Sequence, residues 1–379
     1  MNQRKTVVFC SNTSWFLFNF RYKVIRNFVN EGYRVVCLAP SDDYSVRLVE
    51  ELGAEYLPVN IEGKSTSFLK EIQAVISIFS ILFKLKPIFV FNSTIKLNLY
   101  AGIACFFLRV PFGNNVSGLG TVFLHNNFLF KLVRLFYGKI NQKAECLFFE
   151  NEDDLSVFKN AKLLGKSRVV MLPGSGVDLE KFAASPLPLS TVVNFVMVAR
   201  ILGDKGVREY VSACQILKSE GFDFRSLLVG PLGVSNRTAI TLDEVQKWQK
   251  EGILKYMGAT DDVRPFLEKS HALVLPSYRE GMPRTVLEAA AMGRPAIVTD
   301  VPGCRQSIEP EVTGWLCNVR DATSLAYSMK KFIQMAPCDR QRAGDAARQR
   351  VEEKFSEEEV VQAYFSCIRR AFDNEAQVL

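Results

Sequence analysis

Short apolar runs that favour β-strands alternate along this chain with longer stretches whose apolar residues recur at helical spacing. Strand, helix and strand in succession are typical of parallel sheets joined by right-handed crossovers. The sequence therefore predicts an α/β fold. The runs that we predict as strands are 6–10, 34–38, 88–91, 147–149, 168–172, 194–199, 226–229, 255–257, 272–275 and 296–299.

The alternation is interrupted at residues 183–190, AASPLPLS, which contain two prolines, two serines and no charge. Such a composition favours a linker, and the strand and helix pattern starts afresh after it. We therefore predict two doubly wound domains, an N-terminal one over 1–182 and a C-terminal one over 191–354. The last stretch, 355–379, has helical periodicity and no following strand, so we expect a helix that packs towards the N-terminal domain.

Composition supports an ordinary globular protein, because 48% of the 379 residues are hydrophobic and 23% are charged. The longest apolar stretches, 72–83 and 99–108, are shorter than the roughly 18–20 residues of a spanning helix. The N-terminal residues lack the pattern of a signal peptide, which predicts a cytoplasmic protein. The nine cysteines are scattered without a Cys-x-x-Cys pair, so we expect reduced core thiols, with neither a disulfide framework nor a zinc site.

The net charge of +7 is unevenly distributed. Residues 1–180 have 21 Lys and Arg against 15 Asp and Glu, whereas residues 181–379 have 26 against 25. A basic half indicates an anionic partner, namely nucleic acid, anionic lipid or a phosphorylated substrate, although a solvated basic surface is the commoner explanation. In residues 128–140, FLFKLVRLFYGKI, apolar residues are interleaved with three cations. We give equal weight to two interpretations: a stretch that lies on an anionic membrane, and a core helix with a basic outer face.

One candidate motif, PSYREGMPRTVLE at 276–288, directly follows a predicted strand. In open α/β sheets, ligands bind beyond the carboxyl ends of strands. Pro283 suits a first helical turn, and a helix start after Glu280, Gly281 and Met282 offers backbone N–H groups to a phosphate or another anion. If helical, the segment would separate Glu280 from Glu288 by about 12 Å, which disfavours a glycosidase pair and suits two parts of one elongated ligand. The alternative is that Glu280 only complements the helix dipole and Glu288 is a solvated helix residue.

A second motif, ARILGDKG at 199–206, also follows a predicted strand and precedes a predicted helix. Its two cations, Arg200 and Lys205, are placed to point to the same edge of the sheet. Two fixed cations beside a helix N-terminus suit a diphosphate leaving group, because negative charge grows on it as its bond breaks. Lys205 is equally compatible with a solvated surface position.

Together these motifs resemble the large family-4 group of retaining glycosyltransferases with the GT-B fold, in which two Rossmann-like domains face each other across a cleft. The two glutamates match that family's Glu-x7-Glu motif. The resemblance covers the C-terminal domain, with a weaker likeness before it. It rests on Gly176-Val177-Asp178, Phe182, Arg200, Lys205-Gly206, Gly258, Pro276-Ser277, Glu280-Gly281, Glu288-Ala289, Gly293, Pro295 and Gly314-Trp315.

The resemblance implies a role for each matching residue. Arg200 and Lys205 would clamp the nucleotide diphosphate, and Glu288 would hold the ribose hydroxyls. Glu280, with the Gly281 and Met282 amides beside Pro283, would hold the donor sugar. A UDP-sugar is the implied donor, and no cofactor or metal is expected; the chain has no Asp-x-Asp triplet, in agreement with a metal-independent GT-B pattern.

The N-terminal domain departs from the family, because the loop after its first predicted strand, 11–15, has no glycine. Its acceptor-side candidates are Asn12, Ser14, Ser117 and Gly118. Neither histidine, His125 or His271, matches the family's cleft histidine, so no protein base is assigned and the leaving phosphate would take the acceptor's proton.

Two N-terminal segments, 13–21 (TSWFLFNFR) and 117–120 (SGLG), resemble bacterial enzymes that add an N-acetylhexosamine or hexose to undecaprenyl-diphosphate-linked saccharides in surface glycan assembly. This resemblance implies a lipid-linked acceptor and a peripheral location on the inner face of the cytoplasmic membrane. Two alternatives stay open. A GT-B epimerase would need further acid and base groups, and a basic nucleic-acid binder would need a recognisable binding module.

Overall fold

The computed structural model describes residues 4–61, 68–118, 128–234 and 236–376. The chain divides into two compact units, each with its own parallel sheet. Unit 1 comprises residues 1–175 and 357–379, and unit 2 comprises residues 176–356. The predicted architecture of two Rossmann-like domains is confirmed. The segment 183–190 has no helix or strand and belongs to unit 2.

Unit 1 contains a seven-stranded sheet in the order β3-β2-β1-β4-β5-β6-β7, with every pair parallel. The central strands are continuous apolar runs because helices cover both of their faces. In the centre, Val8 of β1 lies opposite Val36 of β2 and Val90 of β4. The strands are β1 (Thr6–Cys10), β2 (Arg34–Ala39), β3 (Glu55–Pro58), β4 (Phe89–Ser93), β5 (Phe112–Val116), β6 (Cys146–Phe149) and β7 (Arg168–Met171).

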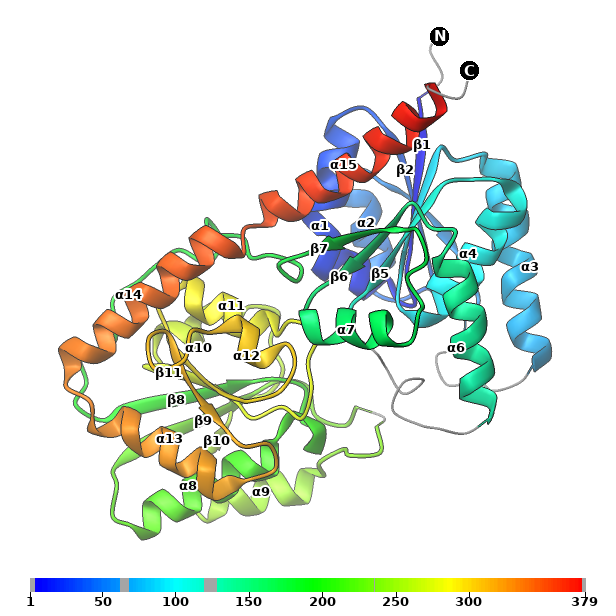
Figure 1. The fold of residues 1–379 in the computed structure, drawn as a ribbon. Coiled ribbons are helices and arrows are strands. Elements are labelled where there is room, and N and C mark those ends of the chain that lie inside the picture. The colour runs from blue at the N-terminus through cyan, green and yellow to red at the C-terminus, as the bar shows by residue number, and fades with distance from the viewer. Residues whose placement is uncertain (1–3, 62–67, 119–127, 235, 377–379) are drawn as a thin grey trace. The chain divides into compact units, whose positions relative to one another are not determined.

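Two helical layers cover the unit 1 sheet (Figure 1). One face packs against α1 (Ser14–Asn30), α2 (Tyr44–Glu50) and the C-terminal helix α15 (Glu357–Ala376). The other face packs against α3 (Phe68–Leu85), α4 (Ile95–Leu108), α6 (Phe128–Asn141) and α7 (Glu152–Asn160). Local signals set the helix starts; for example, Thr13 Oγ1 caps α1 by accepting from the Phe16 N–H at 3.0 Å.

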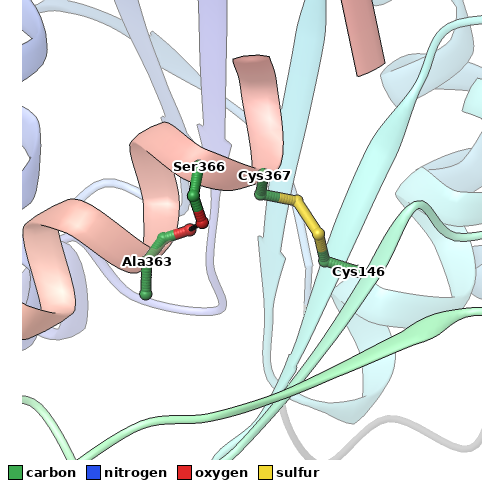
Figure 2. Close-up of a disulfide and its surroundings, with 4 residues drawn as sticks. All are labelled: Cys146, Ala363, Ser366 and Cys367. Carbon is green, nitrogen blue, oxygen red and sulfur yellow. Dashed lines mark hydrogen bonds between the residues drawn. A yellow bond between two sulfur atoms is a disulfide. The ribbon is translucent and has the colours of Figure 1, made fainter. Parts of the chain in front are cut away.

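Helix α15 is joined to the sheet of unit 1 by a disulfide between Cys146 in β6 and Cys367 (Figure 2). The expectation of nine reduced thiols is therefore wrong. The two cysteines are 221 residues apart in sequence and belong to one apolar cluster, in which Tyr364 and Phe365 of α15 also pack. Folding brings this pair together, and cysteine spacing cannot reveal such a contact.

Unit 2 contains a six-stranded parallel sheet in the order β10-β9-β8-β11-β12-β13. Its strands are β8 (Val193–Val198), β9 (Phe224–Val229), β10 (Lys255–Tyr256), β11 (Ala272–Leu275), β12 (Ala296–Thr299) and β13 (Gly314–Cys317). Its helices are the short 3-10 helix η1 (Gly203–Lys205), α8 (Val207–Ser219), α9 (Leu242–Lys250), α10 (Arg264–Glu268), α11 (Arg284–Ala291), α12 (Cys304–Ser307), α13 (Ala322–Gln334) and α14 (Pro337–Lys354).

The strand expectations missed β3, β5 and β13. The β5 residues, FGNNV, include a glycine and two asparagines, which are depleted in strands, yet all five are buried. No helix in the described parts of the chain has the length and apolar character to cross a membrane.

Candidate functional site

The loops that follow the central strands of unit 2 meet at the carboxyl edge of its sheet. The loop after β12 lies against the loop after β11, because a Cβ atom on Gly303 would lie 2.5 Å from the Glu280 carbonyl oxygen and 2.6 Å from that of Gly281. Glu280 also donates its backbone N–H to the Pro302 carbonyl at 3.3 Å. These contacts fix the position of the backbone around Glu280.

At this edge Lys205 and Glu280 form an ion pair, with Lys205 Nζ 2.5 Å from Glu280 Oε1. Ser277 Oγ donates to the same carboxylate oxygen at 2.5 Å, and Thr299 Oγ1 donates to the Ser277 carbonyl. The Lys205 and Glu280 side chains are 20% and 14% exposed. Lys205 is therefore not the solvated residue of the alternative interpretation, and both charges are held in place while still reaching solvent.

The backbone beside the ion pair is equally constrained. Gly206 has a φ of +77°, and a Cβ there would lie 2.1 Å from the Pro276 carbonyl oxygen. Tyr278 donates its backbone N–H to the Asp204 carbonyl at 2.9 Å, and its hydroxyl donates to Glu209 Oε1 at 2.7 Å. Burial, reinforced by Glu209, raises the pKa of Tyr278 to about 12. The loop after β8 and the loop after β11 are thus joined on both sides of Lys205.

Helix α11 begins at Arg284, one residue later than expected, and Pro283 is its N-cap with extended backbone. Residues 280–283 are therefore not helical, and the helical separation estimated for the two glutamates does not apply. Glu288 is 8% exposed, so the alternative of a solvated helix residue is wrong. Arg284 Nε donates to Glu288 Oε1 at 2.9 Å, but burial is the larger influence and raises the pKa of Glu288.

The remaining unit 2 candidates lie in the same two loops. Arg200 is exposed in the turn after β8, outside the Lys205 and Glu280 ion pair. Gly281 is partly buried, and Met282 is partly buried and packs against the core of the unit. The structure thus brings Lys205 and Glu280 into contact. It places Arg200, Gly281, Met282, Pro283 and Glu288 on the loops and helix around that contact.

The acceptor-side candidates lie at the carboxyl edge of the unit 1 sheet. Asn12 follows β1, and Ser117 and Gly118 follow β5; all three are partly buried. Ser14 is fully buried, and its hydroxyl bonds to the Pro40 carbonyl and to Ser45 Oγ, at 3.1 and 3.0 Å. Its side chain therefore joins two loops. Leu119, Gly120 and His125 lie outside the described residues.

A pocket of about 590 Å³ opens at this edge of unit 1, after β2 and β3 and beside the first turns of α3. None of the four acceptor-side candidates lines it. Six of its nine lining residues are polar, and the lining consists of Pro40, Ser41, Asn60, Ile61, Lys70, Glu71, Gln73, Ala74 and Ser77.

His271 is structural. It is 2% exposed at the start of β11, where its Nδ1 accepts the Asn194 N–H at 3.0 Å and its Nε2 lies 3.1 Å from the Pro188 carbonyl oxygen. Burial, with the nearby Arg340 and Arg294 charges, lowers its pKa.

Residues 193–335, which contain the whole Lys205 and Glu280 constellation, match the family described as glycosyl transferases group 1. This stretch is a glycosyl transferases group 1 domain. The match covers less than half of the chain and lies entirely within unit 2. It thus assigns the ion pair, α11 and their connecting loops to the group 1 domain.

Two curated bacterial relatives extend the likeness beyond the group 1 domain. The chain is 24% identical to a Campylobacter jejuni N,N'-diacetylbacillosaminyl-diphospho-undecaprenol alpha-1,3-N-acetylgalactosaminyltransferase, covering 97% of this chain and 99% of the relative. It is 26% identical to an Escherichia coli UDP-Gal:alpha-D-GlcNAc-diphosphoundecaprenol alpha-1,3-galactosyltransferase, covering 77% of this chain and 81% of the relative. Both relatives are sugar transferases that act on undecaprenol-diphosphate-linked saccharides.

Solved structures agree with the fold. A glycosyltransferase from Rickettsia africae superposes with a TM-score of 0.80 over 98% of this chain and 100% of its own, at 16% identity. Anabaena HepE, solved with UDP, superposes with a TM-score of 0.79 over 97% and 100%, at 14% identity. These neighbours confirm the expected GT-B architecture. None of the four proteins named here is an epimerase or a nucleic-acid-binding protein.

Sequence reasoning missed the contacts of several residues that shape the site. Ser277, in the loop after β11, donates to the Glu280 carboxylate, and Thr299 at the end of β12 donates to the Ser277 carbonyl; no sequence spacing links Ser277 with Thr299. Arg284 had a usable signal, because it lies four residues before Glu288 and residues i and i+4 share a helix face. The close approaches at Gly206 and Gly303 are visible only in three dimensions.

Proposed function

We propose that this chain is a retaining glycosyltransferase that moves a hexose or N-acetylhexosamine from a UDP-sugar to an undecaprenyl-diphosphate-linked saccharide. The observation that carries the proposal is the Lys205 and Glu280 ion pair at the carboxyl edge of the group 1 domain. A cation held at a fixed position, next to a carboxylate that accepts hydrogen bonds, suits a ligand with a diphosphate at one end and hydroxyls at the other.

In this proposal the group 1 domain holds the donor. Lys205 and the exposed Arg200 neutralise the diphosphate, and Glu288 accepts hydrogen bonds from the ribose hydroxyls. Glu280 accepts from the donor sugar, while Gly281, Met282 and Pro283 form the turn that approaches it. Because the ion pair fixes Lys205 before the ligand binds, little reorganisation is needed when charge develops on the phosphate.

The chemistry needs no metal and no protein base. The bond from the sugar C1 to the diphosphate oxygen breaks, and its electron pair stays on the β-phosphate. The acceptor hydroxyl oxygen attacks C1 from the same face, and its proton passes to the departing phosphate oxygen. Configuration is thereby retained, and Lys205 and Arg200 stabilise the charge on the departing UDP.

The acceptor belongs to unit 1 in this proposal. Asn12, Ser117, Gly118 and the backbone at Ser14 lie on the carboxyl edge of its sheet, as does the pocket of about 590 Å³. Amide and hydroxyl groups in the pocket lining, such as Asn60, Gln73 and Ser77, match the hydrogen-bonding needs of a saccharide. A lipid-linked acceptor also implies that the protein works at the inner surface of the membrane.

The first test measures thermal stability in EDTA with UDP, GDP, ADP or no nucleotide. A ligand at 100 times its dissociation constant stabilises the folded state by about 2.7 kcal/mol, so a shift with UDP alone supports both the donor class and metal independence. Release of UDP is then measured with UDP-hexoses and UDP-N-acetylhexosamines on undecaprenyl-diphosphate-linked saccharides. The anomeric configuration of the product tests retention. Failure to release UDP with any of these donors and acceptors contradicts the proposal.

Variants identify the site. Lys205→Met and Glu280→Gln are each expected to lower turnover at least about 100-fold, the scale of losing one preorganised charge contact. The matched controls are Lys330→Met and Glu220→Gln, which break a surface ion pair of 2.7 Å in the same unit. Turnover of the controls should stay near that of the wild type. Equal losses in the two pairs would mean that the Lys205 and Glu280 pair has only a structural role.

A further inference from the structure

Helix α3 of unit 1 is apolar on its outward face as well as on its core face. Its core face buries Ala74, Ile78 and Leu82. The opposite face carries exposed large apolar residues separated by three, four and seven positions, which places them in one stripe along the helix. They are Leu69, Ile72, Ile76 and Phe83, and two of them, Leu69 and Phe83, are 72% and 60% exposed.

The neighbouring helices continue this surface. Helix α4 has charged residues only near its ends, at Lys96 and at its C-cap Arg109, and it exposes Phe106 and Phe107. Helix α6 exposes Leu135 and Phe136. Figure 1 shows α3, α4 and α6 side by side in the layer that covers one face of the unit 1 sheet. We call the outward side of this layer the α3–α4–α6 face. A helix that is apolar all round normally has a partner on each side.

The charges on this layer have one dominant sign. Segments 68–110 and 128–143 contain nine Lys and Arg residues and a single acidic residue, Glu71. Glu71 is neutralised within the layer, because its Oε1 is 2.8 Å from Lys96 Nζ and its Oε2 accepts from the Tyr100 hydroxyl. The rest of residues 1–180 has 12 Lys and Arg against 14 Asp and Glu. The basic excess of this half of the chain is therefore located on these helices and their ends.

We propose that the α3–α4–α6 face docks onto an anionic lipid bilayer, with the apolar side chains among the acyl chains and the cations at the headgroups. Exposed aliphatic and aromatic side chains surrounded by Lys and Arg are complementary to such an interface. A nucleic acid would leave the apolar stripe without a partner. The proposal names the membrane contact implied by a lipid-linked acceptor, and to that extent it rests on the proposed function.

Helix α3 contributes residues both to this face and to the pocket of about 590 Å³ that is proposed to hold the acceptor. Lys70, Gln73 and Ser77 line the pocket, while Leu69, Ile72 and Ile76 belong to the apolar stripe. With the stripe in the bilayer, the pocket opens beside the headgroup layer, where the saccharide of a lipid-linked acceptor lies. Docking by this face therefore positions the acceptor as well as the protein.

The test is flotation of the full chain with vesicles of phosphatidylcholine alone or of phosphatidylcholine mixed with phosphatidylglycerol. We expect binding to the anionic vesicles, weakened by salt. Ile76→Gln and Phe107→Gln should each weaken binding at least about tenfold, the effect of losing one buried apolar side chain. Lys84→Gln, in the last turn of α3, should weaken it about fivefold.

The matched controls change equally exposed residues elsewhere. Val46→Gln in α2 replaces a side chain that is 58% exposed, as Ile76 is, and Lys250→Gln removes an exposed cation from the last turn of α9. Neither should change vesicle binding. Equal binding of wild type, Ile76→Gln and Val46→Gln, or no binding at all, overturns the proposal. Thermal melts of all variants exclude misfolding.

Two further measurements separate this proposal from its alternatives. Sedimentation velocity tests self-association; a wild-type dimer that Ile76→Gln dissociates, with no vesicle binding, would assign the face to a second copy and overturn membrane docking. Turnover of Ile76→Gln should match the wild type on a short-chain, water-soluble acceptor and fall on an acceptor embedded in vesicles. Vesicle binding without turnover of either acceptor by the wild type would contradict the proposed function and leave the docking intact.

Discussion

Gly206→Ala tests whether the close approach of two loops positions the candidate donor site. Gly206 has a φ of +77°, in the left-handed region, and an added Cβ would lie 2.1 Å from the Pro276 carbonyl oxygen and 2.7 Å from its carbonyl carbon. Contacts under 3.0 Å are essentially never observed for Cβ atoms, so the backbone at Pro276 must move. Pro276 leads directly into Ser277 and Glu280, so the displacement reaches the ion pair.

The expected loss of folding free energy in Gly206→Ala has two parts. A left-handed conformation costs an alanine roughly 1–2 kcal/mol, and overpacking against fixed backbone adds about 1–3 kcal/mol. Gly221→Ala is the matched control, because Gly221 has a φ of +83° in the same unit and nothing lies within 4 Å of its added Cβ. The control therefore has only the cost of the left-handed conformation, and the difference in stability between the two variants measures the cost of the close approach.

The assay is thermal unfolding of both variants, followed by UDP titration. For a unit of this size, each 1 kcal/mol lowers the Tm by about 2–4 °C, so Gly206→Ala should melt below Gly221→Ala by at least about 2 °C. UDP affinity should fall at least about tenfold in Gly206→Ala and stay unchanged in Gly221→Ala, since only the first displaces Glu280. Equal Tm values and equal UDP affinities in the two variants would refute the reasoning.

Three further predictions concern stability and ionisation. Without reductant, seven of the nine cysteines should react after denaturation, and Cys367→Ser should lower stability by up to about 5 kcal/mol in the chain-entropy estimate; nine reactive thiols would contradict the Cys146–Cys367 bond. The Tyr278 phenol should ionise near pH 12, and Glu209→Gln should lower that pKa in a spectrophotometric titration; an unchanged value would remove Glu209 as a cause. The pKa of His271 is lowered in the folded state, so the contribution of the neutral imidazole to stability is present above about pH 6.5 and is lost as the pH falls. In denaturant titrations, His271→Gln should therefore flatten this part of the dependence of the unfolding free energy on pH.

Much of the strand pattern could be predicted because parallel strands buried on both faces are continuous apolar runs. The runs predicted at 6–10, 272–275 and 296–299 match β1, β11 and β12 residue for residue. β5 has no such run, because its polar side chains form hydrogen bonds with residues from elsewhere in the fold. Asn114 accepts from Asn92 of β4 at 2.9 Å and donates to Asn141 of α6 at 2.8 Å. A buried hydrogen-bond network of this kind leaves no local sequence signal.

The candidate donor site could be predicted as a set of residue types, but not as a set of contacts. Topology places residues that follow parallel strands at one edge, so Lys205 and Glu280 could both be assigned to that edge. That they pair at 2.5 Å depends on the position of the loop after β11, which Gly206, Gly303 and Thr299 determine from three other segments. Chain-distant contacts of this sort, like the Cys146–Cys367 pair, follow from packing, and residue spacing does not encode them.

The uneven charge shows how structure narrows what composition leaves open. Judged by composition alone, the basic half of the chain, residues 1–180, is compatible with nucleic acid, anionic lipid or a phosphorylated substrate. The structure separates these partners by what accompanies the cations. Outside that half, the Lys205 cation is paired with a carboxylate in a partly buried site, which suits a small phosphorylated ligand. Within the basic half, α3, α4 and α6 have both cations and exposed apolar side chains such as Ile76 and Phe107, and a partner with an anionic and an apolar layer would satisfy both. The basic excess of residues 1–180 and the Lys205 cation in residues 181–379 are therefore separate features, and we expect a different anionic partner for each.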